Sequence, residues 1–252
     1  MMNTKSILLA TAIAAALVPA ANAALVWTGA AAGDVAELFL EANWLDDNGA
    51  VPADGTIDPG TPVTAATGGL IQINSGTGTP DRVGGTFQIG DGNNLLVGGG
   101  KTLQTTGFEG LRVDGGYEKH QSATIVDASA INVQYLVNLA VTLNGGSTLR
   151  LRGGGNPING GSTIDIQDTA SLLLFDNETW TDFNNDHKSK TTYQGAALVF
   201  GSDPYAVESG DNAVATDYNG TSGVQIQAVP EPSSALMPLG LLALGALLRR
   251  RK

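Results

Sequence analysis

The sequence predicts an all-β protein, and within that class a parallel β-solenoid in which short strands stack as successive rungs. Glycine is abundant, with 34 among 252 residues, and only 15% of the residues are charged. Apolar residues fall in short runs separated by Gly, Asn, Asp and Thr, which is typical of short strands joined by tight turns. Stretches with helical periodicity are almost absent from the middle of the chain. An antiparallel β-sandwich of the jelly-roll type is the alternative, because it too consists of strands at intervals with turn signals between them.

A loose repeat of the form apolar-x-apolar-x-Gly-Gly favours the solenoid. It occurs at residues 95–99, 111–116, 141–146 and 149–154. Alternating aliphatic and polar residues give a strand one buried face, and the glycines permit the sharp corner that follows. Further strand-like segments are residues 86–89, 124–126, 131–133, 164–166 and 172–175. We therefore expect rungs of uneven length over about residues 70–176, within a β-rich passenger domain of residues 70–228.

After this region the apolar segment 196–200 and a last strand-like segment, 224–226, are separated by a polar stretch rich in Asp, Gly and Asn. We expect segment 224–226 to close the fold.

The N-terminus has the three parts of a secretory signal peptide, assigned to residues 1–23. Lys5 supplies the positive charge, residues 7–18 the apolar core, and Ala21-Asn22-Ala23 the small-residue cleavage site. Cleavage after Ala23 would make Ala24 the first residue of the mature chain, so export machinery and signal peptidase are expected partners. An uncleaved N-terminal helical anchor is the less favoured alternative, because the apolar core is short.

Residues 24–69 differ from the rest of the passenger. Trp27-Thr28-Gly29 is followed by Asn43-Trp44 and by a segment rich in Gly, Pro and Asp. This pattern resembles the N-terminal capping region of secreted bacterial β-solenoid proteins. A solenoid needs such a cap because its open end exposes apolar core and unpaired strand edges. We expect Trp27 and Trp44 to pack in the cap rather than to stack on carbohydrate, and residues 33–40 to form a short helix capped by Asp34.

The last 24 residues, 229–252, form a distinct segment. Pro230-Glu231-Pro232 precedes an apolar run over residues 235–248, which is shorter than the roughly 20 residues of an ordinary membrane helix. Four cations end the chain: Arg249, Arg250, Arg251 and Lys252. They would stay on the cytoplasmic side, and Pro230-Glu231-Pro232 would then lie just outside the opposite face.

This arrangement resembles the PEP-CTERM sorting signal of Gram-negative bacteria. The resemblance implies a short transmembrane sorting helix and an exosortase, an integral-membrane enzyme that removes the tail. It also implies export with transient inner-membrane anchoring, followed by release to the cell surface or extracellular matrix. The alternatives are a plain hydrophobic anchor or a buried helix.

The charge of the processed chain limits its partners. Removing Glu231, Lys5 and the four terminal cations from totals of 24 acidic and 13 basic residues leaves 23 acidic and 8 basic side chains, a net charge of −15. Such a surface is a poor candidate for binding nucleic acid or anionic lipid. The chain has no cysteine, which excludes disulfides and thiolate chemistry.

Motifs for catalysis or cofactors are not found, and we expect neither. His120 and His187 lie in polar surroundings, where exposed side chains are expected. Asp165 and Asp168 are three positions apart in a strand-like segment, so they would point to opposite faces and would not form a catalytic dyad.

The most polar segment, residues 176–190, places Asp182, Asn184 and Asp186 at alternate positions, as in the first half of an EF-hand loop. The second half does not match, because His187 stands where glycine is needed and Tyr193 where glutamate is needed. A looser calcium site formed by Asp176, Asp182 and Asp186 together with Glu178 remains as the alternative to a solvated acidic loop.

The sequence thus predicts a secreted, non-enzymatic protein of the cell surface or biofilm matrix. One alternative is a β-helix protein that binds or degrades extracellular polysaccharide. Another is a permanently membrane-anchored periplasmic protein.

Overall fold

The structure is a computed structural model that describes residues 24–30, 38, 40–46, 48–53, 70–73, 81–83, 87–90, 93–106, 110–113, 121–218 and 222–230. Within these residues the chain is mostly β-strand, with one short α-helix and three other short helical turns. The segments predicted as a signal helix and as a membrane-spanning sorting helix lie outside them. None of the helices in the described part is long and apolar enough to span a bilayer.

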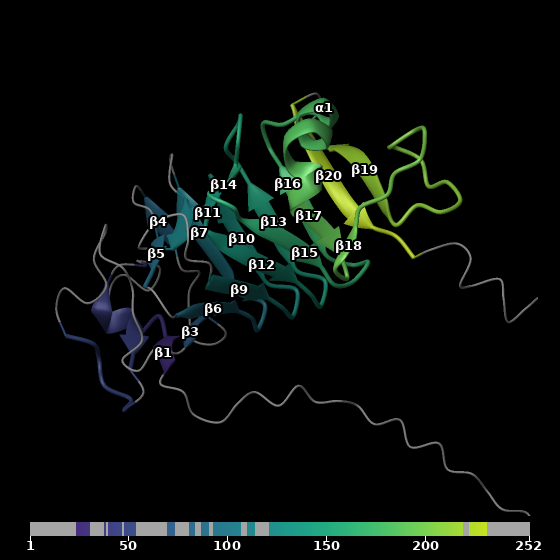
Figure 1. Cartoon of the computed structure of the whole chain (residues 1–252). Coiled ribbons are helices and arrows are strands. Elements are labelled where there is room, and N and C mark those ends of the chain that lie inside the picture. Colours follow the sequence, from purple (N-terminus) through teal and green to yellow (C-terminus); the bar gives the residue numbers. More distant parts are fainter. Residues whose placement is uncertain are drawn as a thin grey trace, which may run out of the picture.

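The described strands form three sheets (Figure 1). The first has nine strands, in the order β18 (Ala196–Ala197), β17 (Thr191–Tyr193), β15 (Thr163–Ile166), β12 (Leu139–Leu143), β9 (Gln121–Ile125), β6 (Asn94–Val97), β3 (Leu70–Ile73), β1 (Ala24–Trp27) and β2 (Trp44–Leu45). The second has seven, in the order β19 (Ala213–Tyr218), β20 (Gly223–Ala228), β16 (Leu172–Phe175), β13 (Thr148–Leu151), β10 (Ala130–Val133), β7 (Thr102–Thr106) and β4 (Asp81–Val83). The third has four, in the order β14 (Ile158–Asn159), β11 (Leu136–Val137), β8 (Leu111–Val113) and β5 (Phe87–Ile89).

From β3 to β16 the chain visits the first, second and third sheets in rotation. Each strand from β3 to β13 pairs in parallel with the strand three places further along the chain, as β9 does with β12 and β10 with β13. The aligned residues Leu95 and Ala123 are 28 positions apart, whereas Ala123 and Val141 are only 18 apart. The additional residues of the longer repeats therefore lie in the segments between strands, and the strands themselves stay in register.

Parallel pairing extends beyond the predicted limits of residues 70–176. β1 pairs in parallel with β3, so the predicted capping region contributes a strand to the first sheet, and β17 continues the same sheet after β15. In the described part, antiparallel pairs occur only at the two ends of the sheets, between β1 and β2, β17 and β18, β16 and β20, and β19 and β20. An antiparallel sandwich would instead require antiparallel neighbours throughout.

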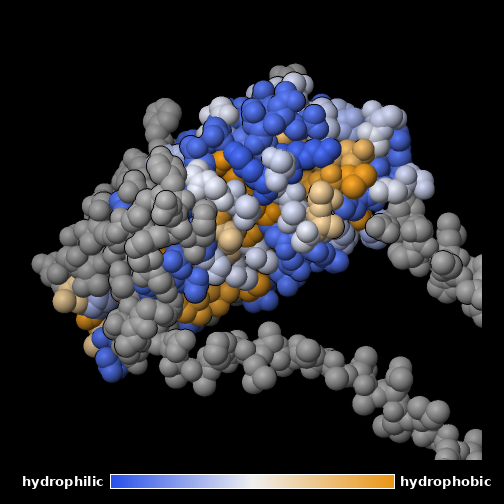
Figure 2. All heavy atoms as spheres, viewed as in Figure 1, coloured by the Kyte–Doolittle hydropathy of each residue, from blue (hydrophilic) through white to orange (hydrophobic). Residues whose placement is uncertain are grey.

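The core lies between the sheets and consists of columns of aliphatic side chains. The burial pattern alternates along most strands, for example Ile131 and Val133 on β10 and Leu149 and Leu151 on β13. Because these strands are in register, Ile131 lies beside Leu149 and Val133 beside Leu151. Each fully buried Leu, Ile or Val contributes roughly 1.5–3 kcal/mol. Figure 2 shows mainly hydrophilic side chains on the visible surface, with orange apolar groups interspersed among them.

The predicted glycine corners are present. Gly145 and Gly146 join β12 to β13 with φ of 65° and 72°, in the left-handed region that favours glycine. A Cβ on Gly145 would lie 2.8 Å from the backbone nitrogen of Asp127, in the turn between β9 and β10. The glycine thus serves two purposes, since it provides the turn and lets adjacent corners stack closely.

Two tryptophans pack at the N-terminal end. Trp27 on β1 and Trp44 on β2 are both fully buried, and their rings meet edge to face with centroids 5.3 Å apart. The Trp44 indole N–H donates to the Leu38 carbonyl (2.9 Å). The packing prediction for these residues is confirmed, and stacking on carbohydrate is excluded because no ring face is exposed. The helix predicted over residues 33–40 lies largely outside the described residues.

Candidate functional site

The end of the fold that carries β19 and β20 is the candidate functional site. There the chain runs toward the predicted sorting motif. β20 ends at Ala228, and Pro230 follows two residues later with its side chain exposed. At the opposite end β1 begins at Ala24, which pairs with Leu70.

Most of the predicted processing signals lie outside the described residues. This applies to Ala21 and Ala23 of the signal cleavage site, to Glu231 and Pro232 of the sorting motif, and to the terminal cations Arg249, Arg250, Arg251 and Lys252.

The chain leaves the fold beside residues 199–212, which we term the exit loop. The Val229 N–H donates to the Asn212 carbonyl (2.9 Å), and the Asn212 N–H donates to the Val199 carbonyl (3.2 Å). The Asn212 side chain accepts from the Val199 N–H (2.8 Å) and donates to the Ala197 carbonyl (3.0 Å). Asn212 is buried and joins both ends of the loop to the segment that leads into the tail.

Hydrogen bonds within the exit loop hold its shape. The Glu208 carboxylate accepts from the Ser202 N–H (3.1 Å) and hydroxyl (2.9 Å), and these bonds lower the pKa of Glu208. The Glu208 N–H donates to the buried Asp211 carboxylate (2.7 Å). The Pro204 carbonyl accepts from the Ala215 N–H of β19 (2.8 Å). The loop therefore covers part of the outer edge of β19, an edge that would otherwise be open to pairing.

Residues 180–190, between β16 and β17, are helical rather than a solvated loop, which corrects the prediction for the acidic segment. They form α1 (Trp180–Asp182), the π-helical turn η2 (Phe183–His187) and the 3-10 turn η3 (Lys188–Lys190). Thr179 and Asp182 form a reciprocal capping box at the start. The spacing Thr-x-x-Asp is the sequence signal that could have revealed this helix.

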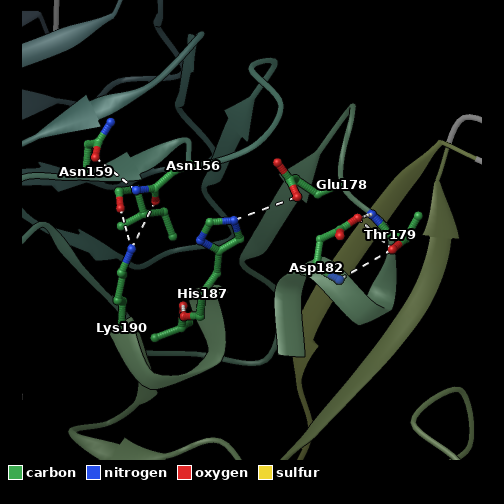
Figure 3. Close-up of polar contacts among 9 residues, drawn as sticks. Asn156, Asn159, Glu178, Thr179, Asp182, His187 and Lys190 are labelled. Atoms are coloured by element: carbon green, nitrogen blue, oxygen red, sulfur yellow. Dashed lines mark hydrogen bonds and ion pairs between the residues drawn. The ribbon is translucent and has the colours of Figure 1, made fainter. Parts of the chain in front are cut away.

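The helical segment covers the end of the core. No further strand of the third sheet follows β14 in the described part, and the chain forms the helical turns at that point instead. Phe183 is buried with its ring centroid 5.6 Å from that of Phe175. Lys190 donates to the Ile158 carbonyl (2.7 Å) and to the Asn156 side chain (3.1 Å), which gives β14 a partner at its edge (Figure 3).

His187 is fully buried, so the prediction that it is exposed was wrong. Its ring stacks on Phe175 with centroids 5.3 Å apart and planes at 11°. Burial lowers its pKa to about 4, the positive charge of Lys190 acts in the same direction, and Asp186 and Asp182 oppose the shift. The imidazole is therefore neutral near pH 7, which suits a ring packed against an aromatic core. His120 lies outside the described residues.

Glu178 is the only acidic side chain within ion-pair distance of His187 in the described part, at 3.9 Å from carboxylate oxygen to Nε2 (Figure 3). Its side chain is 2% exposed, and burial raises its pKa. Neither ring nitrogen of His187 has a hydrogen-bond partner, and one Glu178 oxygen also has none. This buried polar pair could not be predicted from the sequence, because nothing in the local pattern distinguishes it from a solvated loop.

The candidate calcium ligands Asp176 and Asp182 form hydrogen bonds with different partners. Asp176 accepts from Arg150 Nε with both carboxylate oxygens (2.9 and 3.1 Å) and from a terminal guanidinium nitrogen (2.9 Å), and this contact raises the pKa of Arg150. Asp182 accepts from the Thr179 N–H (2.9 Å) and hydroxyl (2.7 Å), which lowers the pKa of Asp182. Asp186 is exposed. Among the residues described, no group of three or more His, Cys, Asp or Glu side chains is arranged to hold a metal ion.

Asp165 and Asp168 also have separate local partners. Asp165, on β15, accepts from the Thr192 hydroxyl (2.7 Å) and the Gly195 N–H (3.0 Å). Asp168 lies in the following turn and accepts from the N–H groups of Ala170 and Ser171, both at 2.8 Å. Both therefore help to shape turns and strand ends, and these contacts give them no shared acid and base geometry.

Comparison with known proteins identified no relative of the chain. No family model, no curated protein and no solved structure matches the chain.

Proposed function

We propose that this chain is a secreted, non-enzymatic protein of the cell surface or extracellular matrix, sorted by an exosortase through residues 229–252. One observation carries the proposal: the first and last strands of the described part lie next to the two predicted processing points. β1 begins at Ala24, the residue that signal peptidase would leave first, and β20 ends at Ala228, one residue before the sorting segment begins. Both processing events would then leave the folded domain whole.

The exposed exit of the tail also supports sorting. Pro230 is exposed and follows a strand that is paired on both sides. A protease acting near Pro230-Glu231-Pro232 would meet an accessible chain and would not need to unfold β20. Before cleavage, the apolar run and the terminal cations would hold the protein at the outer face of the inner membrane.

We further propose that the passenger is a parallel β-solenoid. The rotation of the chain through three sheets supports this fold, as does the in-register parallel pairing of strands three apart. A stack of this kind is stiff along its axis and presents polar side chains on its outer faces, which suits a structural component of a matrix. The acidic side chains at the candidate site hydrogen-bond to their own local neighbours, which also favours a structural role.

The test is the intact mass and the location of the native protein in its own organism, with and without the exosortase gene. We expect a mature protein outside the cell that starts at Ala24 and is trimmed near Pro230 only when the enzyme is present. A full-length tail in the inner membrane of both strains would refute sorting and leave a permanently anchored periplasmic protein. A variant with Pro230 and Pro232 replaced by Ala should keep its tail even when the exosortase gene is present, as the native protein does when that gene is deleted.

A second candidate is binding of an extracellular polysaccharide on the outward face of the second sheet. The strand register aligns Gln104, Asn132 and Arg150 in one column, and all three side chains are partly exposed. The Asn132 amide donates to the Gln104 carbonyl oxygen (3.3 Å), and the Arg150 guanidinium lies 5.7 Å from the centre of the Tyr218 ring. Amide, guanidinium and aromatic groups together suit the hydroxyls and the apolar faces of sugars.

Retardation in a native gel that contains the organism's own polysaccharide tests this second candidate. Asn132→Ala should weaken the retardation if the second sheet binds, while Thr142→Ala on the outward side of the first sheet serves as the matched control. Equal retardation of both variants and the wild type would exclude this face.

A further inference from the structure

The exit loop exposes an unusual share of the large apolar side chains. In the part of the chain that the structure describes, four such residues are exposed, and three of them belong to this loop: Val199 (47%), Tyr205 (46%) and Val207 (53%). The fourth, Val51, follows the N-terminal strand β2. Single exposed apolar residues need no explanation, but three of them within nine residues of one loop are a candidate contact surface.

The loop is built to hold these side chains outward. Its ends are tied by the buried Asn212, and the bonds of Glu208 to Ser202 close its middle. The Tyr205 N–H donates to Asp203 (3.0 Å). The ring is exposed, while partial burial of its hydroxyl and a hydrogen bond to Asp217 raise the pKa of Tyr205. A surface fixed in advance loses little conformational entropy when a partner binds.

The loop also lies where the tail leaves the domain, since Val229 bonds directly to Asn212. Five residues, Pro230 to Ser234, separate this point from the apolar run that starts at Ala235. Even a fully extended chain of five residues spans only about 17 Å. When the tail is inserted, the exit loop must therefore lie close to the bilayer and to any enzyme that acts on the tail there.

The charge of the loop favours a protein partner over lipid. Residues 199–212 contain no Lys or Arg, and their accessible acidic residues are Asp203 and Glu208, since Asp211 is buried. Lys188, from the preceding helical segment, lies 5.2 Å from the centre of the Phe200 ring. Surfaces that bind bacterial membranes combine apolar groups with cations, because the lipid headgroups carry negative charge. An apolar and acidic surface is repelled by such headgroups but matches a protein surface with apolar and cationic groups.

We propose that the exit loop, through Val199, Tyr205 and Val207, docks onto the outward-facing surface of the membrane enzyme that trims the tail. This inference rests on the proposed function, since it requires that the tail be trimmed. The docked loop holds Pro230-Glu231-Pro232 at the enzyme, so recognition includes part of the folded domain as well as the tail. The domain thereby sets how fast its own tail is removed.

Pulse-chase measurement of tail removal from the full-length chain, in its own organism, tests the docking. The triple variant Val199→Ser, Tyr205→Ser, Val207→Ser should be trimmed about tenfold more slowly than wild type, as expected for loss of a small cluster of contact residues. The control is Val51→Ser, because Val51 is equally exposed but follows the N-terminal strand β2 and lies outside the exit loop. This variant should be trimmed at the wild-type rate. Tyr205→Phe keeps the ring and should stay near wild type. An unchanged melting temperature of the purified triple variant shows that it folds.

The two proposals fail differently. If the wild-type tail is never trimmed, the sorting function is refuted. If the wild type is trimmed and the triple variant is trimmed equally fast, sorting stands and docking is overturned. Docking on the enzyme is also overturned if the wild-type chain floats with vesicles of phosphatidylethanolamine and phosphatidylglycerol through these side chains, or if sedimentation shows dimers that the triple variant loses.

Discussion

Acidification is expected to destabilise the fold through His187. The ring is buried against Phe175, and its pKa is lowered from 6.5 to about 4, first by burial and second by the charge of Lys190. Between these two values the unfolded chain holds a proton that the folded chain does not. Stability is therefore fully present above about pH 6.5 and is lost as the pH falls toward 4.

The size of the effect follows from the two pKa values. Each pH unit in this window changes the free energy of unfolding by about 1.4 kcal/mol at most. Integrated from about pH 7.5 to about pH 5, the loss that His187 causes is about 2 kcal/mol. Glu178 acts in the opposite direction, because its raised pKa makes the folded chain hold a proton that the unfolded chain has lost above pH 4.5. Its contribution is present at low pH and declines as the pH rises.

Comparison of variants isolates the histidine. Urea unfolding followed by tryptophan fluorescence should give a smaller pH dependence for His187→Leu than for wild type, by about 2 kcal/mol over this range. His120→Leu is the matched control, because it removes the other of the two histidines and leaves His187 to titrate. Proton NMR of the imidazole C–H signals measures the pKa directly. A value of 6.5 or above for His187, or the same pH dependence in His187→Leu and wild type, would refute the reasoning.

Three further outcomes are expected. Trp44→Ala should lower the free energy of unfolding by about 3–5 kcal/mol, because it removes a buried ring and its edge-to-face contact with Trp27. A loss below about 1 kcal/mol in urea unfolding would contradict the packing role. Gly145→Ala should be more destabilising than Gly155→Ala by about 1 kcal/mol or more. Both glycines have positive φ, but only at Gly145 would the new Cβ meet a backbone atom, the Asp127 nitrogen. Equal melting temperatures of the two variants would count against close stacking of the turns. Asp168→Ala should cost about 1 kcal/mol at pH 7 by removing the hydrogen bonds that Asp168 accepts from the N–H groups of Ala170 and Ser171, the Ser171 hydroxyl and, at 3.4 Å, the Gly146 N–H. Because the pKa of Asp168 is lowered, this difference should shrink as the pH falls through and below 3.8, and a difference that persists at pH 2 would contradict the hydrogen-bond account.

The strands of the middle of the chain could be predicted because their signal is local. Val141 and Leu143 alternate with polar residues and are followed by Gly145 and Gly146, and the structure places a strand and then a corner there. Leu172–Phe175 was likewise predicted and is β16. A buried face with period two and a following glycine turn specify a strand and its end without reference to distant residues.

Features that depend on distant contacts were missed. β19 was assigned to a polar stretch because its buried residues, Ala213 and Ala215, are small and give little apolar signal; its pairing with β20 makes it a strand. The burial of His187 has the same origin. Its neighbours in the chain are polar, so the sequence gives no sign of burial. In the structure, the helical segment that starts at the Thr179 capping box places the His187 ring against Phe175.

The position of β20 has a mechanical consequence. This strand lies between β16 and β19 and runs antiparallel to both, and the tail continues from its end. A force applied to the chain beyond Ala228, while the rest of the domain is held, acts along the strand axis. Two ladders of hydrogen bonds then share the force in shear, and many bonds must break together before the domain opens. A tail attached to an edge strand would instead detach that strand one bond at a time.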